Sequence, residues 1–132
     1  MSQSSGTPLA RKLGIRPGAA VALVDAPDGW SIPDLPDGVV LGHVLADAAD
    51  VVVRFVRMRA EVGVGLAELG AAIRPAGALW IAWPRRAGGH ESDVTETGLR
   101  EAILPCGLVD TKVAALDVDW SALRFVWRRE LR

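Results

Sequence analysis

The sequence contains no tyrosine, two histidines, two lysines and a single cysteine, Cys106, among its 132 residues. One cysteine cannot form a disulfide within the chain, and it excludes a zinc site built from several thiolates. A chain that uses so little cysteine fits a reducing compartment, so we expect a cytoplasmic protein. We expect Cys106 itself to be a small residue of the core.

Charge of one sign and long apolar runs are also lacking. Fifteen Lys and Arg balance sixteen Asp and Glu, which leaves a formal net charge of −1. Such a chain lacks the positive charge of a nucleic-acid-binding domain, so no nucleic-acid partner is expected. No run approaches the roughly 20 apolar residues that cross a bilayer, and residues 1–9 lack the apolar segment of a signal peptide. A membrane partner is therefore not expected.

The same composition favours one globular domain. Half of the residues are hydrophobic, which is enough for a core in a chain of this length. We expect a flexible N-terminal tail over residues 1–6 and a single α/β domain over residues 7–132.

The histidines and serines do not form known catalytic or metal-binding patterns. His43 and His90 lie far apart in the chain and match neither H-x-x-x-H nor H-E-x-x-H. No serine lies in a G-x-S-x-G motif. We therefore expect no metal site, and these patterns indicate no catalytic residue.

Short apolar runs bounded by turn residues predict buried strands. We expect six strands, at residues 20–25, 39–44, 51–56, 78–83, 109–116 and 123–129. Helical spacing and capping residues predict helices at 8–13, 59–73 and from Asp93 or Thr95 to about Leu104. Residues 26–38 contain three prolines and two glycines, which is typical of a loop.

The order of these elements predicts the fold class. Strands that alternate with helices form βαβ units, whose strands run parallel. The last connection is too short for a crossover, so the last strand runs antiparallel. We expect a three-layer, Rossmann-like α/β fold with a mostly parallel sheet and an antiparallel C-terminal strand.

Two segments resemble turns of a known fold. Residues 13–18 (LGIRPG), followed by Val21 and Asp25, resemble the entry to the first strand of class I S-adenosylmethionine-dependent methyltransferases. Residues 73–81 (IRPAGALWI) look like the turn into their fifth strand, and the closing hairpin is similar to the end of their fold. The resemblance implies a truncated, methyltransferase-like domain.

Other motifs resemble a bacterial family known as domain of unknown function number 3052. They are residues 83–86 (WPRR), 93–96 (DVTE), 107–113 (GLVDTKV) and 120–126 (WSALRFV). Lysine is more usual in that family after the Trp-Pro pair, where this chain has Arg85. The resemblance covers nearly the whole chain and implies a small cytoplasmic protein without an assigned activity.

The residues after the first two strands decide our expectation for a cofactor. A methyl-donor site needs a glycine-rich turn after the first strand and an acidic residue after the second. Here the first turn is DAPDGW, with one glycine and a rigid proline, and the second strand is followed by Leu45 and Ala46. We therefore expect no cofactor and judge S-adenosylmethionine unlikely. The expected function is a non-enzymatic module that acts through protein contacts or small-ligand sensing and that could form a homo-oligomer.

An alternative is a small-molecule-binding or transferase enzyme that uses the carboxyl edge of the sheet, where ligands of open α/β sheets bind. Arginine forks and an indole at this edge suit an anionic ligand, and the loop after the fourth strand leads to a helix N-terminus. The candidate ligand-binding residues are Asp25, Asp28, Arg57, Arg59, Trp83, Arg85, Arg86 and His90. A structural interpretation also stays open, in which Arg57 pairs with Asp25 or Glu61 and the other side chains are solvated.

Overall fold

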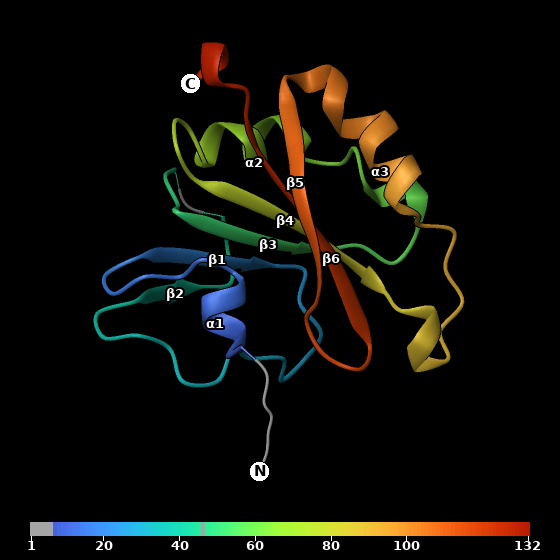
Figure 1. Cartoon of the computed structure of the whole chain (residues 1–132), viewed down its shortest axis with the longest axis horizontal. Coiled ribbons are helices and arrows are strands. Elements are labelled where there is room, and N and C mark those ends of the chain that lie inside the picture. The colour runs from blue at the N-terminus through green and yellow to red at the C-terminus, as the bar shows by residue number, and fades with distance from the viewer. Residues whose placement is uncertain (1–6, 46) are drawn as a thin grey trace.

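Six strands form one mixed sheet in the computed structural model, which describes residues 7–45 and 47–132 (Figure 1). The expected tail, residues 1–6, lies outside the described residues. The strands are β1 (Ala20–Val24), β2 (Val40–Gly42), β3 (Val51–Phe55), β4 (Ala78–Pro84), β5 (Leu108–Ala115) and β6 (Trp120–Trp127). Their order across the sheet is β2-β1-β3-β4-β6-β5.

The strand directions follow from the lengths of the connections. β2, β1, β3 and β4 run parallel. The connections from β1 to β2 and from β3 to β4 are long enough for the crossover that parallel strands need. β6 runs antiparallel to both β4 and β5, and residues 116–119 are too few for anything but a hairpin. The expected Rossmann-like α/β fold with an antiparallel C-terminal strand is confirmed.

Three short helices and one long loop cover the two faces of the sheet. On one face, α2 (Leu66–Ala72) and α3 (Glu96–Ile103) pack on a core that includes Leu79 and Phe125. On the other face, α1 (Leu9–Lys12) and the loop between β1 and β2 pack on a second core around Trp80. Within the described residues, no helix is long and apolar enough to cross a membrane.

Two expectations about local structure are wrong. The helix expected over residues 59–73 is a 3-10 turn, η1 (Arg59–Glu61), followed by α2, because Gly65 has a left-handed backbone with φ of 70°. Cys106, expected in the core, is exposed in the 3-10 turn after α3. Pro105 directs the chain there into a surface turn, which carries the thiol out of the core.

The last strand joins the sheet to α2 through a close contact. The indole Nε1 of Trp127 donates a hydrogen bond to the carbonyl of Gly70 at 2.8 Å. A Cβ atom at Gly70 would lie 3.0 Å from the Trp127 ring, so only glycine lets α2 approach this closely without displacement. Phe125 and Trp127 thus pack against a helix, as expected from the alternation in β6.

Glycine is also needed directly before β4, where backbone surrounds Gly77. A Cβ atom at Gly77 would lie 2.8 Å from the carbonyl oxygen of Ala49 and 2.9 Å from that of Ile73. Because these backbone atoms can move only at a high energetic cost, we expect Gly77→Ala to lower the free energy of unfolding by about 2–3 kcal/mol. Gly63→Ala is the matched control, because that Cβ meets no atom within 4 Å and should cost nothing. Urea denaturation of both variants checks this, and equal stabilities would contradict it.

Candidate functional site

The carboxyl edge of the parallel strands carries a cavity between the ends of β1 and β2. We name it the β1–β2 cavity; it has a volume of about 520 Å³ and is lined by Leu23, residues 25–31 and His43. Two of the expected ligand-binding residues, Asp25 and Asp28, lie in this lining. The place corresponds to the position where open α/β sheets bind ligands.

The loop between β1 and β2 forms the wall of this cavity and is anchored at several points. Ile32 is buried in the core beneath α1. Trp30 packs edge-on against Phe55 with ring centroids 4.8 Å apart, and its Nε1 donates to Asp117 Oδ2 at 2.9 Å. The loop is therefore fixed to the sheet and to the β5–β6 turn, although it contains no helix.

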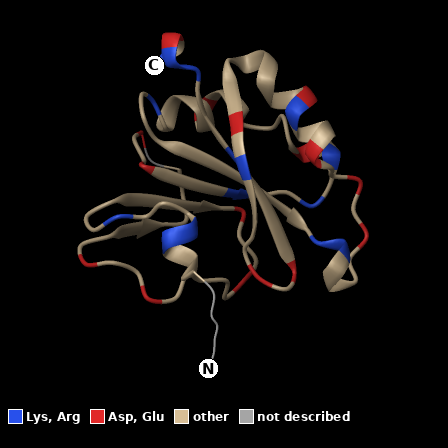
Figure 2. Cartoon of the chain, in the orientation of Figure 1, with Lys and Arg blue, Asp and Glu red and all other residues tan. Residues whose placement is uncertain are grey.

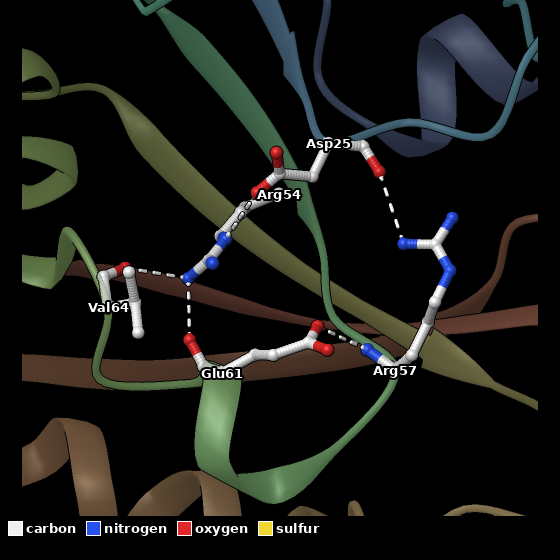
Figure 3. A network of polar contacts seen from close by, with 5 residues as sticks. All are labelled: Asp25, Arg54, Arg57, Glu61 and Val64. Carbon is white, nitrogen blue, oxygen red and sulfur yellow. Dashed lines mark hydrogen bonds and ion pairs between the residues drawn. The ribbon is translucent and has the colours of Figure 1, made fainter.

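Arg54 pairs with Asp25 of the cavity lining and is the one buried charged residue within the described part of the chain, with 5% of its surface exposed. Its Nε is 3.3 Å from Oδ2 of Asp25, and its Nη1 donates to the carbonyls of Glu61 and Val64 at 3.0 and 2.8 Å (Figure 3). The guanidinium thereby joins β3 to the turn at Asp25, directly after β1, and to the segment before α2. A buried cation needs such compensation by a carboxylate and carbonyls.

Arg57 lies at the end of β3, between Asp25 and the last strand. Its backbone N–H donates to Glu61 Oε1 at 2.9 Å, and its guanidinium donates to the backbone carbonyl of Asp25 at 3.5 Å (Figure 3). The guanidinium also lies 5.4 Å from the ring centroid of Trp120, a cation–π distance. The contacts to Asp25 and Glu61 exist, but the ion pair with the Asp25 carboxylate comes from Arg54.

Sequence analysis missed Arg54, although a signal was present. The residue stands alone as a charge within the β-branched run VVVRFV, which otherwise predicts a strand buried on both faces. A charge at such a position needs a partner, and Asp25 at the carboxyl end of the neighbouring strand was available. Asp25 has a positive φ of 59°, a conformation that aspartate tolerates better than most residues.

A second cavity, the β4–α3 cavity, lies further along the same edge and has a volume of about 580 Å³. Trp83, Arg85 and Arg86 from the end of β4 line it, together with Ser92 and residues from the first turn of α3. Arg85 donates to the carbonyl of Asp117 at 2.9 Å, which fixes its position. Arg86 has no ion pair in the described part of the chain and is exposed.

At the α3 end of this cavity, the helix N-terminus is capped and the charge of Arg100 is neutralised by carboxylates. The Thr95 hydroxyl accepts a hydrogen bond from the N–H of Gly98 at 3.0 Å and caps the helix. Arg100 also lines the cavity, but it binds Asp110 at 2.9 Å and Glu96 at 3.1 Å. The hydrogen bond that Arg100 donates to the Asp110 carboxylate raises the pKa of Arg100. Arg85 and Arg86 therefore remain as the arginines of this cavity without a carboxylate partner in residues 7–45 and 47–132.

Three of the expected ligand-binding residues, Arg57, Arg59 and His90, line neither cavity. Arg59 lies beside α3, where its backbone N–H donates to Asp93 at 2.7 Å and its guanidinium is 3.4 Å from Glu101. His90 Nε2 is 2.9 Å from Asp119 in the β5–β6 turn. Within the described residues, no group of three or more His, Cys, Asp or Glu side chains is placed to hold a metal ion.

Arg54 gives the site a structural prediction. We expect Arg54→Met to lower the free energy of unfolding by about 2–3 kcal/mol, because two backbone carbonyls lose a charged donor. Arg59→Met is the control, since its ion pair with Glu101 is exposed on both sides and should contribute no more than about 1 kcal/mol. Thermal and urea unfolding measure both changes. A variant at Arg54 as stable as the wild type would contradict a role in joining β1 to β3.

Solved structures with the same fold include several methyltransferases. The fibrillarin pre-rRNA processing protein of Methanococcus jannaschii superposes with a TM-score of 0.63 at 11% identity, covering 93% of this chain and 70% of that one. A SAM-dependent methyltransferase from Aquifex aeolicus gives 0.61 at 12% identity, with 89% and 86% covered. A TehB-like SAM-dependent methyltransferase from Corynebacterium glutamicum gives 0.53 at 13% identity, with 91% and 87% covered.

These similarities confirm the methyltransferase-like, Rossmann-like fold, and at such identities they concern the fold. No family model and no curated protein matches the sequence. The resemblance to the domain of unknown function number 3052 therefore stays a prediction.

The expectations of no enzyme and of no cofactor are both contradicted, because structures of SAM-dependent methyltransferases are among those that share the fold. The physical reason for the error lies in the connection between β1 and β2. Sequence analysis judged the cofactor from the single glycine and the rigid proline of the turn DAPDGW, with which this connection begins. The structure instead builds a wall from the anchored loop that carries Asp28 and Trp30.

Proposed function

We propose that this chain is a small-molecule methyltransferase that binds S-adenosylmethionine in the β1–β2 cavity and an anionic acceptor in the β4–α3 cavity. The β1–β2 cavity is the observation that carries the proposal. It opens at the carboxyl ends of two parallel strands, and its volume of about 520 Å³ lies within the range of small-molecule sites, about 300–1,000 Å³.

The residues of the β1–β2 cavity fit the chemistry of S-adenosylmethionine. That molecule presents an ammonium group, ribose hydroxyls and a flat adenine ring. Asp25 and Asp28 supply carboxylates for the ammonium and the hydroxyls, and Trp30 supplies an aromatic surface. The backbone at Gly29 has φ of 77° and no atom within 4 Å of the position of a Cβ, so a ligand can approach it closely.

Arg57 does not line the β1–β2 cavity but contacts the backbone of Asp25 beside it, and its charge fits the carboxylate of the same molecule. The Arg57 guanidinium is held between the Asp25 carbonyl and the Trp120 ring, and the residue is exposed. A guanidinium in a fixed position binds carboxylates well because less freedom is lost on binding. When bound, S-adenosylmethionine supplies a methyl group on a positively charged sulfur. The chain holds the methyl acceptor next to S-adenosylmethionine in the orientation that the transfer needs.

Arg85 and Arg86 are suited to hold an anionic acceptor. They follow β4 at the same edge, and Arg85 is oriented by the Asp117 carbonyl. The side chain of Asp117 accepts the hydrogen bond from Trp30, so the β5–β6 turn connects the two cavities. An acceptor with a carboxylate or phosphate group would thus be bound beside the donor site.

The donor site is tested with S-adenosylmethionine itself. We expect S-adenosylmethionine at 100 times its Kd to stabilise the protein by about 2.7 kcal/mol in thermal unfolding. Asp28→Asn should weaken the binding at least tenfold in calorimetry, because it removes a charge from the cavity lining. Asp37→Asn makes the same change in the same loop outside the lining and should bind as the wild type does. Absence of binding to the wild type would overturn the proposal.

The acceptor site is tested with a double variant. We expect Arg85→Ala with Arg86→Ala to stay folded within about 1 kcal/mol, because both side chains lie at the surface or half-buried. It should bind S-adenosylmethionine normally but transfer labelled methyl groups to an extract of anionic metabolites at least tenfold more slowly. Added salt should slow the wild type in the same assay. Equal rates for both proteins would exclude these arginines as acceptor-binding residues.

A further inference from the structure

A third cavity lies at the opposite edge of the sheet, at the amino ends of β1, β3 and β4. We name it the amino-edge cavity; its volume is about 720 Å³, more than that of either cavity at the carboxyl edge. The segments before the three strands form its walls, residues 13–20, 48–51 and 74–78, and Arg124 of β6 completes it. The proposed methyl transfer makes no use of this cavity.

The charged residues of the lining are mostly positive. They are Arg16, Arg74, Arg124 and Asp50. The carboxylate of Asp50 accepts a hydrogen bond from the N–H of Ala20 at 2.8 Å, so its charge is directed at the backbone of β1. Lys and Arg segments are visible at both edges of the sheet, including the turn between α1 and β1 at the left (Figure 2). The amino edge therefore holds an excess of positive charge.

Arg124 is the most informative of these residues. It is half-buried, and its Nη1 donates to the Thr111 hydroxyl at 3.1 Å. No carboxylate lies within ion-pair distance of it in residues 7–45 and 47–132. Burial lowers the pKa of Arg124, and no neighbouring acid raises it again. Because a guanidinium stays charged in a protein, this one lacks a counter-charge.

The strand register increases the need for a negative charge at this place. Lys112 of β5 is the cross-strand partner of Arg124, so two positive residues face each other. Like charges at directly opposite positions destabilise a sheet. The Lys112 ammonium lies 5.8 Å from the centroid of the Trp80 ring, and this contact compensates its positive charge only in part. An anion in the amino-edge cavity would relieve this repulsion.

The other walls are arranged to admit a ligand. Arg74 is held by the Trp127 ring, 3.8 Å from its centroid, and donates to the Leu131 carbonyl, so its position is fixed before any ligand binds. Gly14 and Gly18 have φ near 77° and 78° and no atom within 4 Å of a Cβ position. The backbone of this wall is therefore open to close approach.

We propose that the amino-edge cavity binds a small phosphorylated molecule, whose phosphate is contacted by Arg124 and Arg16. Arginine pairs with phosphate through parallel N–H donors, and the volume leaves room for a sugar or a comparable group beside the phosphate. This second site makes the protein responsive to a phosphorylated metabolite at the edge opposite to the methyl-donor site.

The test uses probes without adenine, so that the proposed methyl-donor site does not take part. Pyrophosphate and ribose 5-phosphate are titrated into the wild type by calorimetry, with ribose as the neutral control. We expect both phosphorylated probes to bind and ribose not to bind. Arg124→Gln and, separately, Arg16→Gln should weaken the binding at least tenfold. Thermal unfolding without ligand shows whether each variant is folded. If one of the two is unfolded, the other still tests the proposal.

Two matched controls separate this site from other arginines. Arg128→Gln removes the same charge from an exposed position outside the cavity and should leave the affinity unchanged. The double variant at Arg85 and Arg86 removes the anion-binding side chains of the β4–α3 cavity, and it should keep the probe binding that Arg124→Gln loses. Loss of binding in the double variant, normal binding in Arg124→Gln, or no binding to the wild type would each overturn the proposal.

Discussion

The buried guanidinium of Arg54 is the interaction on which the carboxyl edge of this protein depends. It enters from the middle of β3, where every neighbouring side chain of the strand is apolar, and is compensated by the Asp25 carboxylate and two carbonyls. A buried cation is stable only when its N–H groups donate to acceptors. The turn after β1 and the segment before α2, which supply these acceptors, are therefore held in fixed positions. Asp25, which Arg54 holds in place, also lines the β1–β2 cavity.

The two edges of the sheet differ in how their charges are compensated. At the carboxyl edge, the Asp25 carboxylate pairs with Arg54, and the guanidinium groups of Arg57 and Arg85 donate to backbone carbonyls. At the amino edge, Arg124 faces Lys112 across the hairpin without a carboxylate among the described residues. A zwitterionic donor with hydroxyls suits the first edge, and an anion suits the second. The two ends of the sheet thus suit ligands of different charge.

The loop between β1 and β2 shows how this chain walls a cavity with a segment that contains no helix. Three aromatic rings, Trp30, Phe55 and Trp120, pack edge to face in succession. This stack holds the loop on the sheet from one side, while Ile32 anchors it in the core beneath α1. Aromatic packing and one indole hydrogen bond therefore replace a helix as the wall.

The sequence by itself determined the fold class. Runs such as VVVRFV and ALWIAW have the length of strands and are rich in β-branched or aromatic residues, which favours buried strands. The short last connection requires an antiparallel end, because a parallel strand needs a longer crossover. It also identified Asp25, Asp28, Arg57, Arg85 and Arg86 as residues of the carboxyl edge, since parallel strands end at a common edge. Only the tertiary structure decided that Arg54 pairs with Asp25, that Arg59 and His90 turn toward other carboxylates, and that a loop can wall a cavity. These outcomes depend on contacts between residues far apart in the chain, about which local patterns carry no information.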